Sequence, residues 1–227
     1  GARFPSLRSV GYLLLSLRAI VRHPTSRSVQ EFDGEFEASR DPWGYDRPDQ
    51  VQRIQVALAE IDRLAASRPD GTVESALEIG CAEGVVTELL AQRCRRLVAV
   101  DLSSVALARC QERCRDLKGI EYRQSDAVGA AAWGPYELVV AMDVLECIRS
   151  PSDLRRARDA IVGMLLPGGH LVVTTTRQHP VPETAWWGRW IPVGARINEF
   201  VGRHPRLETV RELTTGIHAI SLYRKAA

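Results

Sequence analysis

The sequence has little of several features that mark common classes of protein. Among its 227 residues, aromatic side chains make up 6%, and the formal net charge is only +2. Lysine is confined to Lys118 and Lys225, and the remaining positive charge is arginine scattered along the chain. Without a basic cluster there is no electrostatic footprint for nucleic acid or for an anionic membrane. We therefore expect neither nucleic acid nor a membrane among the partners.

A pairing framework for the cysteines is also missing. The five cysteines are odd in number and include no Cys-x-x-Cys pair. A disulfide scaffold or a structural metal site is not expected, and a reducing cytoplasm is the natural location.

Long hydrophobic runs are absent as well. The apolar run Val10–Leu15 is far shorter than the ~20 residues that a membrane-spanning helix needs, and arginines flank it. Apolar side chains around it recur at helical spacing, at Leu7, Val10, Leu14, Leu17 and Val21. This pattern predicts an amphipathic helix that docks on the main domain, closes over a substrate, or joins two chains in a homodimer.

The order of apolar segments predicts an α/β fold. We expect residues 1–70 to form an N-terminal helical cap, with a second amphipathic helix from Val51 to Leu64 after a polar, acidic stretch at 28–50. From Val73 onward, short apolar runs alternate with helical patterns, which is typical of βαβ units and a doubly wound, mostly parallel, Rossmann-like sheet. The expected strands are Val73–Ile79, Arg96–Val100, Ile120–Arg123, Tyr136–Met142 and His170–Thr175, and the expected helices are Val85–Cys94, Ser104–Arg115 and Asp153–Leu166.

The end of the chain follows a different pattern. A helix over Ala195–Arg203 and two strand-like runs, Leu207–Leu213 and Ile217–Arg224, predict an antiparallel hairpin added to the sheet. Residues 71–227 would then form one cofactor-binding domain. The tryptophans that precede this helix, Trp186, Trp187 and Trp190, suit either a hydrophobic latch over the sheet or an aromatic wall for a substrate.

The segment with the strongest chemical signal joins the first strand to its helix, over Glu78-Ile79-Gly80-Cys81-Ala82-Glu83-Gly84. Small residues at 80, 82 and 84 let the backbone turn sharply and approach a ligand. The G-x-A-x-G spacing departs from the G-x-G-x-x-G that cradles a pyrophosphate. Such a loop suits a ligand with an amino-acid tail and a nucleoside but no phosphates.

Three acids at successive strand ends strengthen this interpretation. Asp101 ends the second strand, where a carboxylate can accept both ribose hydroxyls of an adenosine. Asp126 follows the third strand, where it can accept from an adenine amino group, and Asp143 ends the fourth, beside the expected reaction centre. Taken singly, each acid could instead be a helix cap or a solvated strand end.

These motifs resemble the class I S-adenosylmethionine (SAM)-dependent methyltransferases over roughly residues 41–177, including the Leu-Leu-Pro-Gly-Gly-His-Leu-Val-Val segment that starts at Leu165. More narrowly, the loop motif, Cys94-x-Arg96-Leu97 and Asp41-Pro42-Trp43 are similar to the nodulation-factor N-methyltransferase (NodS) family. That family methylates an amino sugar in a chito-oligosaccharide lipid precursor. The resemblance implies SAM as cofactor, S-adenosylhomocysteine (SAH) as product, and methylation of oxygen or nitrogen on a small molecule such as a sugar or another secondary metabolite.

The resemblance also implies roles for individual residues. Cofactor contacts are expected at Glu78, Gly80, Cys81, Ala82, Gly84, Asp101, Leu102, Asp126, Ala127, Asp143, Trp43 and Arg53. Trp43 and Arg53 would help close over the cofactor; the alternatives are a core aromatic and a plain surface arginine. Relatives that use a divalent metal carry Glu-His where this chain has Glu146-Cys147, so no metal is expected.

Removal of the acceptor's proton requires a base, and Asp143, Glu146 and His179 are the candidates. Their alternatives are an acid that only orders its loop, a cap of the following helix and an ordinary loop residue. His170 reads as structural, and His204 and His218 have no visible partner.

Rival functions are a non-catalytic SAM-binding regulatory protein and a nicotinamide-dependent oxidoreductase. The glycine spacing argues against the oxidoreductase. Amino methylation of bases would require an Asn/Asp-Pro-Pro-Tyr/Phe tetrapeptide after the fourth strand, and none follows.

Overall fold

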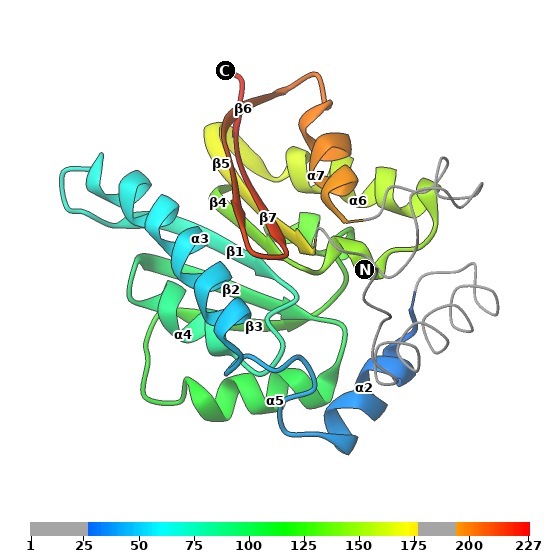
Figure 1. The fold of residues 1–227 in the computed structure, drawn as a ribbon. Helices are drawn as coiled ribbons and strands as arrows, with labels where there is room; N and C mark the ends of the chain where they lie inside the picture. The colour runs from blue at the N-terminus through cyan, green and yellow to red at the C-terminus, as the bar shows by residue number, and fades with distance from the viewer. Residues whose placement is uncertain (1–26, 177–193) are drawn as a thin grey trace, which may run out of the picture.

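In the described part of the chain, seven strands form one sheet (Figure 1). The computed structural model describes residues 27–176 and 194–227. The strand order is β3-β2-β1-β4-β5-β7-β6, with β1 to β5 parallel and β7 antiparallel to both β5 and β6. The strands are β1 Val73–Ile79, β2 Cys94–Asp101, β3 Ile120–Gln124, β4 Tyr136–Met142, β5 Leu165–Thr176, β6 Leu207–Thr215 and β7 His218–Lys225. The predicted parallel sheet with a terminal antiparallel hairpin is confirmed.

Helices cover both faces of this sheet, as its largely apolar strands require. One face packs against the apolar sides of α3 and α4, and α5 packs beside them; α6 and α7 cover the opposite face (Figure 1). The helices are α2 Val29–Ala38, α3 Pro48–Ala66, α4 Val85–Ala91, α5 Ser104–Arg113, α6 Pro151–Gly163 and α7 Ala195–Gly202. This is the doubly wound arrangement, in which ligands bind at the carboxyl ends of the parallel strands.

Local sequence signals explain where several of these helices begin. Pro48 occupies the first turn of α3, where its missing N–H costs nothing. Ser150 caps α6 by accepting from the N–H of Asp153 at 3.3 Å. Ser28 and Glu31 form a reciprocal capping box at the start of α2.

The helix α2 lies within residues 28–50, for which the sequence predicts only a polar, acidic stretch. The helix has few apolar residues, and only Phe36 is buried. Several boundaries also differ by a few residues. Among the largest differences, α4 ends at Ala91, because Cys94 already begins β2, and β5 starts at Leu165 rather than at His170, so that α6 ends at Gly163. The predicted N-terminal helix, His179 and the tryptophans at 186, 187 and 190 lie outside the described residues. The division of the chain at residue 70 stays a prediction.

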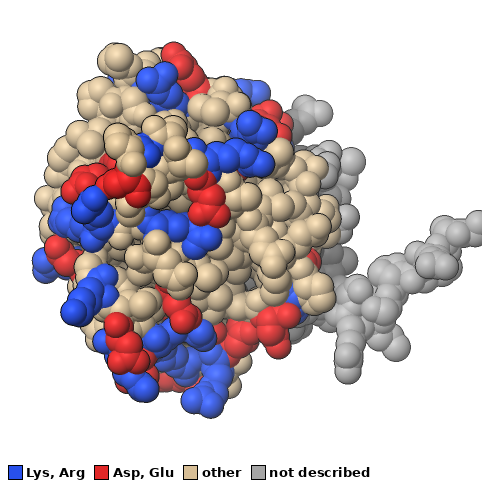
Figure 2. All heavy atoms as spheres, turned by 90° about the vertical axis from the view of Figure 1, so that its left-hand side faces the viewer, with Lys and Arg blue, Asp and Glu red and all other residues tan. Residues whose placement is uncertain are grey.

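Charged side chains of both signs are mixed on the face drawn in Figure 2. Arginines three residues apart in sequence pair with different acids: Arg93 with Asp62 at 2.6 Å, and Arg96 with Glu121 at 3.3 Å. On this face the arginines are scattered among acids, as the sequence predicts.

Candidate active site

A cavity of about 960 Å³ lies at the carboxyl ends of β1, β2 and β4. Its walls also include parts of α2 and the segment before α3. Ten of the predicted site residues line it: Trp43, Arg53, Gly80, Ala82, Asp101, Leu102, Asp126, Ala127, Asp143 and Glu146. Three others, Glu78, Cys81 and Gly84, are absent from the lining of this cavity. The strands therefore bring together residues that are far apart in sequence.

The loop after β1 turns in the left-handed region at alternate residues. Gly80, Ala82 and Gly84 have φ of +75°, +47° and +86°. A Cβ at Gly80 would lie 2.8 Å from the side chain of Val144, and one at Gly84 would lie 2.9 Å from the Cys110 sulfur. Glycine is required at both positions on conformational and steric grounds, which confirms that small residues permit this turn.

Glu78 and Cys81, two of the predicted cofactor residues, are buried beneath the loop after β1 and do not line the cavity. The Glu78 carboxylate is buried and accepts a hydrogen bond from the Thr87 hydroxyl at 2.6 Å. Burial raises the pKa of Glu78 well above its ordinary value. Cys81 is buried against Leu107 and Cys110 of α5. Both side chains thus fix the loop without lining the cavity.

The acids at the ends of β2 and β3 are held by backbone donors. Asp101 accepts from the N–H groups of Ala82 and Ser103, each at 2.9 Å. Burial raises the pKa of Asp101, while these hydrogen bonds act in the opposite direction. Asp126 accepts through Oδ1 from Val128 at 3.1 Å and Gly129 at 2.7 Å. Asp126 therefore caps a short turn as well as lining the cavity.

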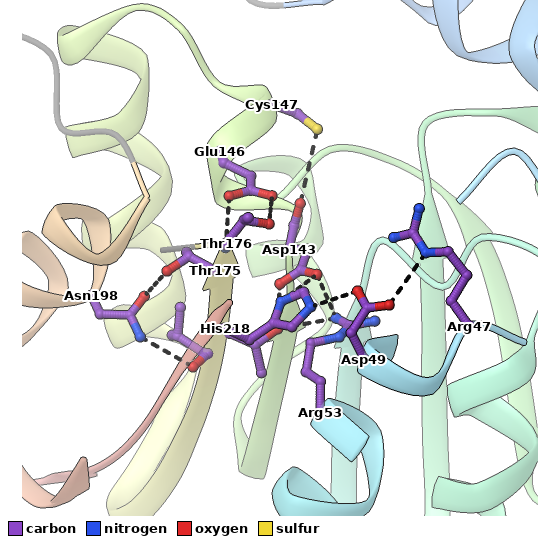
Figure 3. A network of polar contacts seen from close by, with 12 residues as sticks. Arg47, Asp49, Arg53, Asp143, Glu146, Cys147, Thr175, Thr176, Asn198 and His218 are labelled. Atoms are coloured by element: carbon purple, nitrogen blue, oxygen red, sulfur yellow. Dashed lines mark hydrogen bonds and ion pairs between the residues drawn. The ribbon is translucent and has the colours of Figure 1, made fainter. Parts of the chain in front are cut away.

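Asp143 is the centre of a polar network at the end of β4 (Figure 3). Its φ of +53° is unusual for a residue other than glycine. Oδ2 pairs with the Arg53 guanidinium at 2.8 Å, and Oδ1 accepts from the Thr174 hydroxyl at 2.6 Å. Arg53 is 2% exposed, so the alternative of a plain surface arginine is wrong.

Glu146 lies beside this network on the loop after β4. Its carboxylate accepts from the backbone N–H and the hydroxyl of Thr176, at 3.1 and 3.2 Å (Figure 3). Burial and the neighbouring Asp143 charge raise the pKa of Glu146 to about 8. Since Ser150 caps α6, the alternative that Glu146 is this cap is wrong.

His218 was missed by the sequence reasoning, which assigned it no partner. It is fully buried at the start of β7, with Nε2 3.5 Å from Asp49 Oδ2 and Nδ1 3.8 Å from Asp143 Oδ2 (Figure 3). No local motif announces this contact, because three separate elements create it.

The outer wall of the cavity is formed by α2 and the segment that follows it. The Trp43 ring meets Phe36 edge-on, with 6.2 Å between centroids and 76° between planes. The Ser103 hydroxyl donates to Asp33 of α2 at 2.5 Å, and Arg109 donates to the Ser39 carbonyl at 2.7 Å. Trp43 thus packs within a small apolar cluster and lines the cavity as well.

Within residues 27–176 and 194–227, there is no group of three or more His, Cys, Asp or Glu side chains placed to hold a metal ion. Over the same ranges, no helix is long and apolar enough to cross a membrane.

Comparison with known proteins now decides the family. A family model described as "Nodulation protein S (NodS)" matches residues 28–219. The chain belongs to the NodS family. The predicted resemblance is confirmed by a match that includes the α2 wall, the loop after β1 and the start of β7.

Individual NodS proteins resemble the chain to different extents. Nodulation protein S of Sinorhizobium fredii is 33% identical over 60% of this chain and 60% of its own length. That of Azorhizobium caulinodans is 30% identical over 79% of this chain and 82% of its own. The chain spans 57 to 63% of the length of three of the curated relatives it matches.

A solved NodS structure is similar to the whole fold. The crystal structure of N-methyltransferase NodS from Bradyrhizobium japonicum WM9, in complex with SAH, has a TM-score of 0.72 and 28% identity. The alignment covers 88% of this chain and 98% of that one. The class I methyltransferase fold expected from the sequence is therefore confirmed.

Proposed function

We propose that this chain is a SAM-dependent methyltransferase that acts on an amine of a small molecule, an amino sugar in the first instance. The observation that carries the proposal is the order of residues along one cavity. Following the sheet from β3 to β4, its wall presents Asp126, Asp101, the 80–82 loop and Asp143. This order matches a ligand that runs from an adenine through a ribose to an amino-acid tail, with the reacting end over β4.

Each part of the cavity suits one part of the cofactor. Asp101 would accept from the ribose hydroxyls, and Asp126 with Ala127 would meet the adenine. The backbone of Gly80 and Ala82 would approach the methionine part. Arg53 fits this assignment because it lines the cavity and its buried Nε has no hydrogen-bond partner in the described residues.

In this proposal Glu78, Cys81 and Gly84 act on the cofactor through the shape of the loop and not as lining residues of the cavity. These residues shape the loop from behind, as their burial and their contacts with α4 and α5 favour. Leu102 and Trp43 would flank the adenosine from the β2 end and from the outer wall, respectively. Trp43 and Arg53 come from the segment before the sheet, so ordering of that segment would complete the site.

The chemistry demands mainly orientation and the exclusion of water. Bound SAM supplies an activated methyl group on a sulfonium, so the protein must align an acceptor and manage its proton. Asp143 and Glu146 are the carboxyl groups at the acceptor end. At neutral pH Glu146 retains its proton because its pKa is about 8. Asp143 is then the group that accepts, and Glu146 can donate a hydrogen bond to the acceptor.

An amine is favoured over a hydroxyl by two observations. The acceptor end carries the ionised Asp143 carboxylate, which attracts an ammonium ion. The NodS protein of known structure is named an N-methyltransferase. We keep His179 as a further candidate base.

The test is methyl transfer by the purified chain. SAM is supplied with a chitin tetrasaccharide that carries one free 2-amino group, and SAH release and the product mass are followed. We expect one methyl group to be added, and the fully N-acetylated tetrasaccharide, as control, to remain unchanged. SAM binding without transfer to any amine would favour the regulatory alternative, and binding of NAD in place of SAM would favour the oxidoreductase.

Location and assembly belong to the same proposal. A cytoplasmic location is supported by the five cysteines, all of which are free thiols. A homodimer through the helix expected at residues 7–21 is tested by sedimentation of the chain with and without residues 1–26. Loss of mass to a monomer on truncation is the expected result, and an unchanged mass would refute the dimer contact.

A further inference from the structure

A fully buried histidine lies directly behind the acceptor end of the cavity. His218 is 0% exposed, and its two ring nitrogens face Asp49 and Asp143 at 3.5 and 3.8 Å (Figure 3). Neither nitrogen has a hydrogen-bond partner within the described parts of the chain. Burying an imidazole without such partners is costly, unless its N–H groups serve the carboxylates that face them.

The surroundings of the ring contain few other ionisable groups. Helix α3 contributes Asp49 and, on the far side of Asp143, Arg53. The loop after β4 contributes Asp143. The neighbouring strands place the uncharged Thr176 of β5 and Thr215 of β6 opposite His218 in register. The ring is therefore enclosed by two carboxylates, with one guanidinium behind them.

These groups form a continuous path from the cavity to the surface. Asp143 lines the cavity, and its side chain is 20% exposed. At the other end, the Asp49 side chain is 34% exposed and pairs at 3.5 Å with Arg47, whose side chain is 54% exposed and lies at the rim of the same cavity. His218 is the only buried member, and it bridges the two acids. A shift of roughly 0.7 Å at each contact would bring both within hydrogen-bond distance.

An imidazole in this position can take up a proton at one nitrogen and release another from the second. We propose that Asp143, His218 and Asp49 form a proton-transfer chain through which the acceptor's proton leaves the cavity. The proposal rests on the proposed function. In this path His218 touches neither the cofactor nor the acceptor, so it is a positioning residue that acts through Asp143.

The acceptor's proton leaves before the methyl group is transferred. The ammonium form of the acceptor loses one proton to Asp143, which frees the electron pair on its nitrogen. The nitrogen then forms a bond to the methyl carbon as the carbon–sulfur bond breaks, and the electron pair of that bond goes to sulfur. Asp143 passes a proton to His218 Nδ1 while His218 Nε2 releases one to Asp49, and Asp49 releases a proton to water. Rotation of the ring then turns its N–H toward Asp49 again, and the path can accept another proton.

The first experiment needs no acceptor. Histidine labelled with ¹⁵N is incorporated into the full chain, SAH is added, and the ring signals of His218 are assigned by their loss in His218→Gln. We expect these signals to change in Asp49→Asn and to stay unchanged in Asp62→Asn. Asp62 is the matched control because it lies on the same helix and pairs with Arg93 at 2.6 Å. If the His218 ring signals were the same in Asp49→Asn as in the wild type, the proposal would be overturned.

The second experiment measures single-turnover methyl transfer to the free-amine tetrasaccharide in H₂O and D₂O. His218→Gln and Asp49→Asn should each slow transfer by about tenfold to 100-fold and raise the solvent isotope effect. Since both act on one path, the double variant should be no slower than the slower single variant. SAM affinity should change less than about twofold, because the binding wall is intact.

A purely structural role would give a different result. In that case His218→Gln and Asp49→Asn would have lower thermal stability and lower SAM affinity. Their transfer rate and solvent isotope effect, measured with SAM bound, would be unchanged, and this result would overturn the proposed proton-transfer path. Failure of the proposed function can be told apart from failure of the proton-transfer path. If the proposed function is wrong, the wild-type protein transfers no methyl group, and the ¹⁵N signals of the His218 ring still report on its contact with Asp49.

Discussion

Replacing Glu146 by glutamine removes a carboxyl group whose pKa in the folded protein is raised from 4.5 to about 8. Above pH 4.5 the unfolded chain releases this proton while the folded state retains it, so folding loses stability as the pH rises toward 8. Below pH 4.5 both states hold the proton, and the group contributes nothing. At about 1.4 kcal/mol per pKa unit, the full difference is at most ~5 kcal/mol. Because the side chain is only partly buried, we expect about half of that.

The assay is urea unfolding of the wild type and Glu146→Gln at several pH values from 5 to 8.5. Between pH 5 and pH 8, the free energy of unfolding of the variant should rise relative to that of the wild type by roughly 2–3 kcal/mol. Loss of one hydrogen bond to Thr176 adds a constant offset of ~1 kcal/mol. Glu121→Gln is the control: Arg123 and Arg96 lower the pKa of Glu121, so its difference from the wild type should stay constant above pH 5. If the difference in unfolding free energy between Glu146→Gln and the wild type were also independent of pH, the reasoning would be refuted.

Other substitutions test the cavity wall. Gly80→Ala should lower both unfolding free energy, by ~1–3 kcal/mol, and SAM affinity, since its Cβ would meet Val144 in a backbone with φ of +75°. Arg53→Met should cost ~3 kcal/mol in urea unfolding by leaving Asp143 without its buried cation, whereas preserved stability would contradict that pairing. Asp101→Asn should weaken SAM binding at least about tenfold in calorimetry and cost ~1–3 kcal/mol of stability, because an amide nitrogen cannot accept from the N–H of Ala82 or Ser103; unchanged affinity would remove Asp101 from the site.

Much of the fold follows from the sequence because its strands and helices are regular. The limits of β1 and β4 match the predicted ones, since turn residues bound both runs: Asp70-Gly71 and Gly80 for β1, and Gly134-Pro135 and Asp143 for β4. The helix α2 was missed because it has few apolar residues, with only Phe36 buried. Its capping box, Ser28 with Glu31, was the one local signal that could have revealed it.

The site divides in the same way. The loop after β1 and the acids at strand ends could be predicted, because the topology of a parallel sheet collects such residues at one edge. The burial of Arg53 and His218 could not, since arginine is usually exposed. Their partners come from α3, from the loop after β4 and from β5. Such contacts depend on how the elements pack, and no local pattern encodes that.

Calorimetric titration of SAH into the wild type and Asp101→Asn tests the central claim most directly. We predict one site per chain with micromolar affinity in the wild type, at least about tenfold weaker binding in the variant, and no heat with NAD. Equal affinity of the two proteins for SAH, or binding of NAD in its place, would contradict the assignment of this cavity to SAM.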